Sequence, residues 1–130
     1  MISYPKRLKQ VLDFKGIGNS KIHPSDVDAI LEFDNKYLII FEVKLEGVEV
    51  PLGQKILFHR IADCWQKTNG EAFVVYCTHN TNPEDIVSME NSTVRQVYHK
   101  GEIYKREENI RDFLFRLANA YQIEKLQKSL

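Results

Sequence analysis

The chain has 130 residues, of which 43% are hydrophobic and 28% are charged, and its formal net charge is zero. This composition is that of an ordinary globular protein, and we expect one domain over residues 1–130. No apolar run approaches the roughly 18 residues that a transmembrane helix needs, and the N-terminal residues lack the apolar segment of a signal peptide, so we expect a cytoplasmic protein.

Hydrophobic periodicity predicts helices near both ends of the chain and strands between them. The expected elements, in chain order, are a helix over 4–15, a short strand around 21–23, strands over 27–33 and 37–45, a helix over 52–67, a strand over 71–78, a hairpin with strands over 93–98 and 102–105, and a helix over 108–122. This order predicts an α/β fold: a central mixed sheet that contains an antiparallel hairpin and is flanked by helices.

The hairpin expected over 27–45 places its charged residues on one face. The odd-numbered positions of both strands are apolar, and because side chains alternate between the two faces of a strand, we expect these positions to face the core. The even-numbered positions carry Asp26, Asp28, Glu42 and Lys44. The even-numbered positions between them are mostly apolar, so we expect this face to be covered near its middle and open at its charged end.

The turn at 34–36 fixes the register of this hairpin. It pairs Phe33 with Tyr37. The same register places Asp28 opposite Glu42, with Cβ atoms about 4.5–5.5 Å apart. Two carboxylates that close repel each other unless one takes up a proton or a cation lies between them. Oxygen ligands suit a divalent cation, so the register predicts a metal site.

An ordinary solvated hairpin is the alternative interpretation. The register places Asp26 opposite Lys44, where the two could form a cross-strand ion pair on a wet face. However, a partly covered face with two opposed carboxylates and a lysine is costly without a function. We therefore favour a functional site, in which Lys44 lies beside the ion and close to any water bound there.

The segments SDVDAI (25–30) and FEVK (41–44) resemble the Asp…Glu-x-Lys motif of the PD-(D/E)XK nuclease superfamily. The helix opening PLGQK (51–55) adds an early glutamine, as in small phage-type and Holliday-junction-resolvase-like members. The resemblance covers about residues 23–66. It implies a restriction-endonuclease-like core, a Mg²⁺- or Mn²⁺-dependent endonuclease that hydrolyses DNA, and, for a phage-encoded protein, the host cytoplasm as its location.

The resemblance also assigns roles to the matching positions. Asp28 and Glu42 would bind Mg²⁺ or Mn²⁺, helped by the backbone carbonyl of Val43. Lys44 would orient the attacking water and stabilise the developing charge, a task that suits its compact ammonium group. Gln54 would support the site from the helix. The expected catalytic residues are therefore Asp28, Glu42, Lys44 and Gln54.

Two features depart from the pattern of the superfamily. Ser25 precedes Asp26, and the proline of the motif is absent, so Asp26 is an alternative metal ligand. We prefer Asp28, because it lies opposite Glu42. Many members also carry a glutamate on the first helix, where this chain offers only Asp13.

Gln54 stands out without the resemblance as well. At 100° per residue it lies within about 40° of Phe58, Ile61 and Trp65, so it is a polar residue on the expected apolar stripe. A buried amide needs hydrogen-bond partners. It either serves the site or bonds a backbone group of the nearby sheet.

Charge is unevenly distributed along the chain. Residues 1–25 carry five basic residues against one acidic residue, and residues 91–106 carry four against one. Residues 26–50 carry seven acidic residues against two basic ones. Since the net charge is zero, DNA binding must rely on the local basic segments.

The candidate DNA-binding residues are Lys6, Arg7, Lys9, His23, Arg60 and Lys100, together with Arg95, Lys105 and Arg106 around the second hairpin. For His23, His59 and Arg60, an ordinary solvated position is the competing interpretation.

Two other functions compete with a nuclease. One is a non-catalytic module of the same fold that binds nucleic acid or protein, and the other is an interaction protein whose hairpin is simply solvated. Opposed carboxylates argue against the binding module, because binding alone does not need them. Titration with Mn²⁺ discriminates the interaction protein, which should not bind the ion. The resemblance is compatible with a homodimer and with duplex, junction, flap or single-stranded DNA.

Overall fold

The structure, a computed structural model, describes residues 13, 15–18 and 24–130. The helix expected over 4–15 and the short strand expected around 21–23 therefore lie outside the described residues, except for positions 13 and 15. Among the helices that the structure describes, none has both the length and the apolar character needed to cross a membrane.

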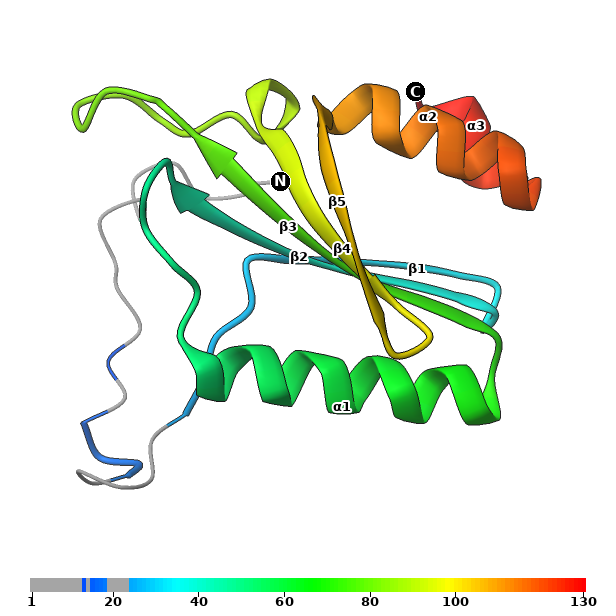
Figure 1. The fold of residues 1–130 in the computed structure, drawn as a ribbon, viewed down its shortest axis with the longest axis horizontal. Coiled ribbons are helices and arrows are strands. Elements are labelled where there is room, and N and C mark those ends of the chain that lie inside the picture. Colours follow the sequence, from blue (N-terminus) through cyan, green and yellow to red (C-terminus); the bar gives the residue numbers. More distant parts are fainter. Residues whose placement is uncertain (1–12, 14, 19–23) are drawn as a thin grey trace.

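The described residues form an α/β fold with a five-stranded mixed sheet. The elements are β1 (Ala29–Phe33), β2 (Tyr37–Leu45), α1 (Leu52–Thr68), β3 (Glu71–His79), the 3-10 turn η2 (Met89–Asn91), β4 (Thr93–His99), β5 (Glu102–Asn109), α2 (Ile110–Tyr121) and α3 (Glu124–Ser129). The strand order is β1-β2-β3-β4-β5. Strands β2 and β3 are parallel and are connected through α1, whereas the other neighbours are antiparallel. Figure 1 shows α1 along one face of the sheet and α2 with α3 over the other.

The C-terminal elements differ most from the sequence prediction. Strand β5 was expected to end at 105, but it pairs with β4 as far as Asn109, so α2 begins at 110 instead of 108. Its last residues are charged, which an edge strand tolerates because solvent surrounds it. Asn109 then caps α2, since its Oδ1 accepts a hydrogen bond from the N–H of Arg111 at 2.8 Å. Helix α3 was not predicted.

Strand β2 is buried on both faces, so the expectation of one core face is incomplete. The odd-numbered Ile39 and Phe41 pack under α2 and α3, in agreement with the sequence analysis. The even-numbered Leu38 and Ile40 pack under α1. This cover extends to Glu42, whose side chain is only 2% exposed, and thus further towards the charged end than expected. The reason is that β2 is an inner strand between two helical layers.

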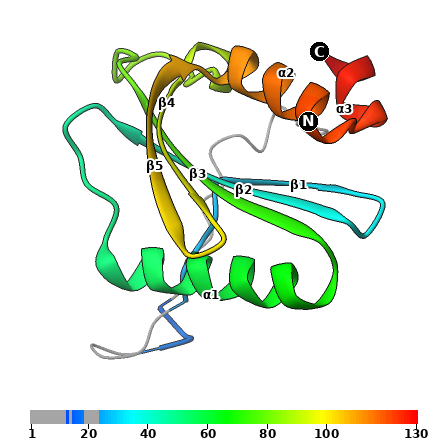
Figure 2. The same ribbon diagram turned by 45° about the vertical axis from the view of Figure 1, so that its right-hand side comes forward.

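Helix α1 packs through a face that is rotated from the predicted one. Phe58 and Ala62, one turn apart, are buried against the sheet, and Trp65 is half-buried. Ile61 was placed on the apolar stripe, but it is 43% exposed. Partly polar side chains fill the packing face instead. The curved β4–β5 hairpin approaches α1 there (Figure 2) and contributes Tyr98 to the same core.

The backbone carbonyl of Lys36, in the β1–β2 turn, joins three elements. It accepts a hydrogen bond from Trp65 Nε1 of α1 at 3.2 Å and one from the N–H of Glu71 of β3 at 2.8 Å. Gly70 lies against the same carbonyl, and a Cβ atom on Gly70 would come within 2.3 Å of its oxygen. Only glycine fits this contact without a backbone shift.

Gly70→Ala should therefore lower the free energy of unfolding by roughly 1–3 kcal/mol, the usual cost of overpacking. Gly53→Ala is the matched control, because a Cβ atom there meets nothing within 4 Å. This control should stabilise the protein by about 0.4–1 kcal/mol, since alanine restricts the unfolded chain. Urea denaturation of both variants measures the difference, and an unchanged stability of Gly70→Ala would contradict the tight contact.

Candidate active site

The predicted register of the β1–β2 hairpin is confirmed. Phe33 lies opposite Tyr37, and the pairing continues to Ala29 opposite Phe41. Asp28 comes directly before β1, one step further along this register. Its Oδ2 accepts a hydrogen bond from the backbone N–H of Val43 at 2.7 Å. This bond replaces a ladder bond just before β1 begins, and it holds the Asp28 carboxylate against the edge of β2.

Glu42 is a buried carboxylate with one unpartnered oxygen. Its Oε1 lies 3.2 Å from Nζ of Lys44, whereas its Oε2 is buried and has no hydrogen-bond partner among the described residues. The pKa of Glu42 is raised to about 6, chiefly because burial disfavours the charged form and then because Asp28 repels it, while Lys44 acts in the opposite direction. The structure thus brings Asp28, Glu42 and Lys44 together.

The backbone carbonyl of Val43 points to the same edge of β2 as the Asp28 carboxylate. In a strand, the N–H and C=O of one residue point to the same edge, because opposed residues exchange both bonds. Since the N–H of Val43 points to Asp28, its carbonyl also points to that edge of β2. Two carboxylates and one backbone carbonyl therefore gather where β1 begins.

Asp26 does not join this group through the predicted pairing. The sheet begins at Ala29, so Asp26 lies outside it and its side chain is exposed. Within the described residues, Lys44 pairs with Glu42 and not with Asp26. The cross-strand ion pair of the solvated-hairpin interpretation is therefore not formed.

Gln54 supports the segment that leads into β1. Its Nε2 donates a hydrogen bond to the backbone carbonyl of Asp26 at 3.0 Å. Of the two alternatives given for Gln54, this is the bond to a backbone group, although the acceptor lies before the sheet and not within it. Because Asp26 is two residues from Asp28, the bond ties the first turn of α1 to the backbone that presents the Asp28 carboxylate. We assign Gln54 a positioning role.

A polar network beside Glu42 was not predicted. His59, expected on solvated surface, is half-buried, and its Nε2 lies 2.8 Å from the hydroxyl of Tyr76. The His59 ring stacks on Tyr98 at 3.8 Å, and Tyr98 donates a hydrogen bond to Asp63 at 2.6 Å. Tyr76 on β3 lies opposite Glu42 on β2, so the network is next to the site. The pKa of Tyr76 is raised, chiefly by burial and then by the charge of Glu42. The i, i+4 spacing of His59 and Asp63 was the available signal.

The predicted DNA-binding residues fall into three groups. Lys6, Arg7, Lys9 and His23 lie outside the described residues. Arg60 is on the outer surface of α1, and Lys100, in the β4–β5 turn, pairs with Glu71 at 3.2 Å. Neither lines the groove that contains Lys44. Arg95, Lys105 and Arg106 do, and this groove has a volume of about 400 Å³.

Removing the buried charge should stabilise the metal-free protein. The pKa of Glu42 rises from 4.5 to about 6 on folding. The folded protein therefore holds the proton more tightly, and stability is lost as pH rises from about 4.5 to about 6. The difference between these two pKa values corresponds to about 2 kcal/mol in the free energy of unfolding. Relative to wild type, Glu42→Gln should therefore raise the free energy of unfolding by roughly 1–2 kcal/mol at about pH 8. At about pH 4 it should change stability by close to nothing.

Urea denaturation in the presence of a chelator tests this at both pH values. Glu84→Gln, which alters an exposed loop carboxylate, is the control and should change stability little at either. A destabilised Glu42→Gln at high pH would show that the ion pair with Lys44 outweighs burial and repulsion.

Comparisons with known proteins return no relative. No protein-family model matches the chain, and no curated protein and no solved structure matches it. The proposed function therefore depends on the residues and geometry of the chain itself.

Proposed function

We propose that the protein is a metal-dependent nuclease that hydrolyses DNA phosphodiester bonds, an endodeoxyribonuclease of the PD-(D/E)XK type that uses Mg²⁺ or Mn²⁺. The observation that carries the proposal is the buried Glu42 carboxylate. It has an unpartnered oxygen, a second carboxylate beside it and a lysine 3.2 Å away. A buried charge of this kind lowers stability, and a bound cation would compensate for it.

The residues present fit a hard divalent cation. Asp28 and Glu42 offer carboxylate oxygens, and the carbonyl of Val43 points to the same edge of β2. Within the part of the chain that the structure describes, no group of three or more His, Cys, Asp or Glu residues gathers at one point. Two carboxylates are nevertheless the usual protein share for Mg²⁺, which keeps waters and binds substrate phosphate at its other positions.

A bound divalent cation would supply Lewis-acid activation of water and of the phosphodiester. Lys44 contributes a fixed positive charge. Its side chain is 29% exposed, so it can reach a phosphate oxygen or a water while Glu42 holds it in place. As a compact cation, it would stabilise the negative charge that develops on the phosphate. Gln54 keeps the backbone before β1 in position.

The topology supports the assignment as well. The antiparallel β1–β2 hairpin presents the two acids, and the α1 connection between the parallel strands β2 and β3 carries Gln54, which bonds the backbone of Asp26 just before the hairpin. A restriction-endonuclease-like core is part of the proposal.

Isothermal titration calorimetry with Mn²⁺ tests the metal site. Wild-type protein should bind, and Asp28→Asn and Glu42→Gln should each weaken binding by at least tenfold. Affinity should rise with pH through about 6, because Glu42 must lose its proton to bind. The exposed Glu84→Gln is the control. Equal binding by all four proteins would place the metal elsewhere and contradict the assignment.

Cleavage of a panel of DNA structures tests the reaction. Asp28→Asn, Glu42→Gln and Lys44→Met should each lose activity by at least about a hundredfold, since each removes charge stabilisation from the transition state. Gln54→Ala should lose less, because it acts through the backbone. Lys67→Met, an exposed lysine on α1, is the matched control. Full activity of Glu42→Gln would refute the site, and binding without cleavage on every substrate would favour the non-catalytic module.

A further inference from the structure

A basic groove extends from the candidate active site across the sheet. Of the twelve residues that line it, five are basic and one, Glu49, is acidic. The basic residues are Lys44, Lys55, Arg95, Lys105 and Arg106. The floor is formed by β2 to β5, and the first turns of α1 and the segment before it form one wall. The groove thus begins at Lys44 and ends at the edge strand.

Most of this positive charge has no ion-pair partner among the residues that the structure describes. Lys55, Lys105 and Arg106 form no ion pair with any residue that the structure describes. Arg95 is held by a hydrogen bond from its Nε to Thr78 Oγ1 at 2.9 Å. Its terminal nitrogens face two exposed carboxylates, those of Glu46 at 3.7 Å and Glu107 at 3.3 Å. Exposed pairs of this kind are weak, so an anion could replace them.

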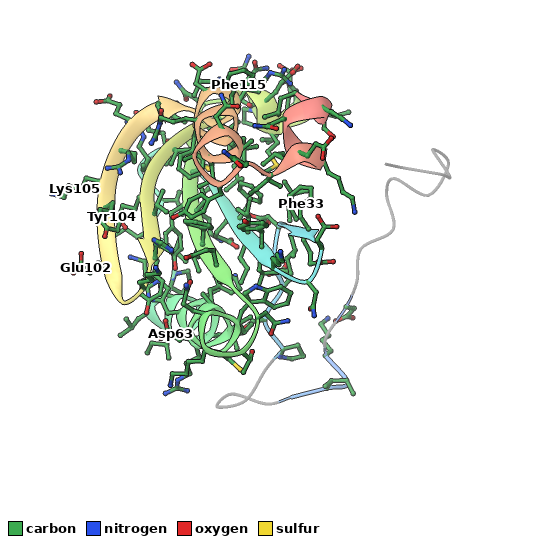
Figure 3. The ribbon with its side chains drawn as sticks, turned by 90° about the vertical axis from the view of Figure 1, so that its right-hand side faces the viewer. Phe33, Asp63, Glu102, Tyr104, Lys105 and Phe115 are labelled. Atoms are coloured by element: carbon green, nitrogen blue, oxygen red, sulfur yellow. The ribbon has the colours of Figure 1, made fainter. Side chains whose placement is uncertain are left out.

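The basic residues follow one another in the order of the strands. Lys44 on β2 lies opposite Thr78 on β3, and Arg95 on β4 bonds that threonine. Lys105 on β5 lies opposite Gln96 of β4. Figure 3 shows Lys105 at the outer edge of the molecule, pointing away from the sheet.

Neighbouring strands are about 4.8 Å apart, so the three steps from β2 to β5 span roughly 14 Å. Successive phosphates of one DNA strand are further apart than the rise of about 3.4 Å per nucleotide along the duplex axis, so a row of this length would contact two or more phosphates. A row of cations of that length matches a polyanion better than a single small anion.

We propose that this groove binds the phosphodiester backbone of one DNA strand. It would hold the phosphates on one side of the bond that lies at Glu42 and Lys44. The inference rests on the proposed function for the identity of the strand. It adds the path that the strand takes and the residues that bind it, and it gives no binding role to Arg60 or Lys100.

Fluorescence anisotropy at several salt concentrations tests the path. The probe is a labelled single-stranded oligonucleotide, alone and annealed to its complement, in Ca²⁺ to favour binding over cleavage. Lys55→Gln/Lys105→Gln removes two lysines that form no ion pair with described residues, one from the α1 wall of the groove and one from its β5 edge. The slope of log affinity against log salt should become shallower by about 1.4 on the single strand and about 1.8 on the duplex.

The control is Lys36→Gln/Lys67→Gln, which removes the same charge from the opposite end of the molecule. These two exposed lysines, in the β1–β2 turn and the last turn of α1, also form no ion pair with described residues. The control should keep the wild-type slope, and thermal unfolding should show that both double variants are folded. The proposed path would be overturned if the groove variant kept the wild-type slope of log affinity against log salt. It would also be overturned if the slope became shallower by the same amount in both double variants.

Cleavage kinetics separate this inference from the proposed function. If wild type cuts DNA, the groove variant should raise KM several-fold with little change in kcat. An unchanged KM and salt slope with intact cleavage would refute the groove and leave the nuclease standing. Loss of salt-dependent binding in the groove variant, with no cleavage by wild type under any metal, would support the groove and refute the nuclease.

Discussion

The position of β2 between two helical layers is the constraint on which the structure depends. Residues Ile39, Ile40 and Phe41 are at most 1% exposed, because each face of the strand packs on a helix and each edge pairs with a neighbour. A strand held this firmly cannot adjust its side chains to solvent. When its apolar run continues into Glu42, the carboxylate is buried with it.

Burial couples the Glu42 carboxylate to its charged neighbours more strongly than a solvated hairpin would. Its carboxylate is close to Asp28 and Lys44, so its protonation, the binding of a cation and the position of the lysine are all linked. In water the same three groups would interact weakly, since solvent screens exposed pairs. The low-dielectric surroundings of β2 strengthen these interactions, at a cost in stability that the two helical layers must offset.

The sequence predicted the hairpin well because the alternation of its side chains and the length of its turn both point to one register. That register was enough to place Asp28 beside Glu42. The face of α1 was predicted less well, because Ile61 looks like a core residue by hydrophobicity, whereas Phe58 and Ala62 make the contact.

Tertiary partners explain the other differences. Nothing in the sequence places Tyr76 and Tyr98 under His59, since they come from separate strands. The end of β5 was missed because an edge strand needs no apolar pattern. The basic groove forms only when four strands and α1 come together, although the excess of positive charge in 91–106 indicated one part of it.

The carbonyl of Lys36 has a consequence for how the molecule opens. It accepts hydrogen bonds from both α1 and β3, so the β1–β2 turn cannot leave its place without freeing groups in two other elements. The hairpin, α1 and β3 should accordingly exchange their amide protons as one cooperative unit. The side chains of the β5 edge are almost all exposed, so its amide protons should exchange sooner. The acids of the site thus lie on the slowly exchanging part of the molecule, and the outer end of the groove lies on the part that opens first.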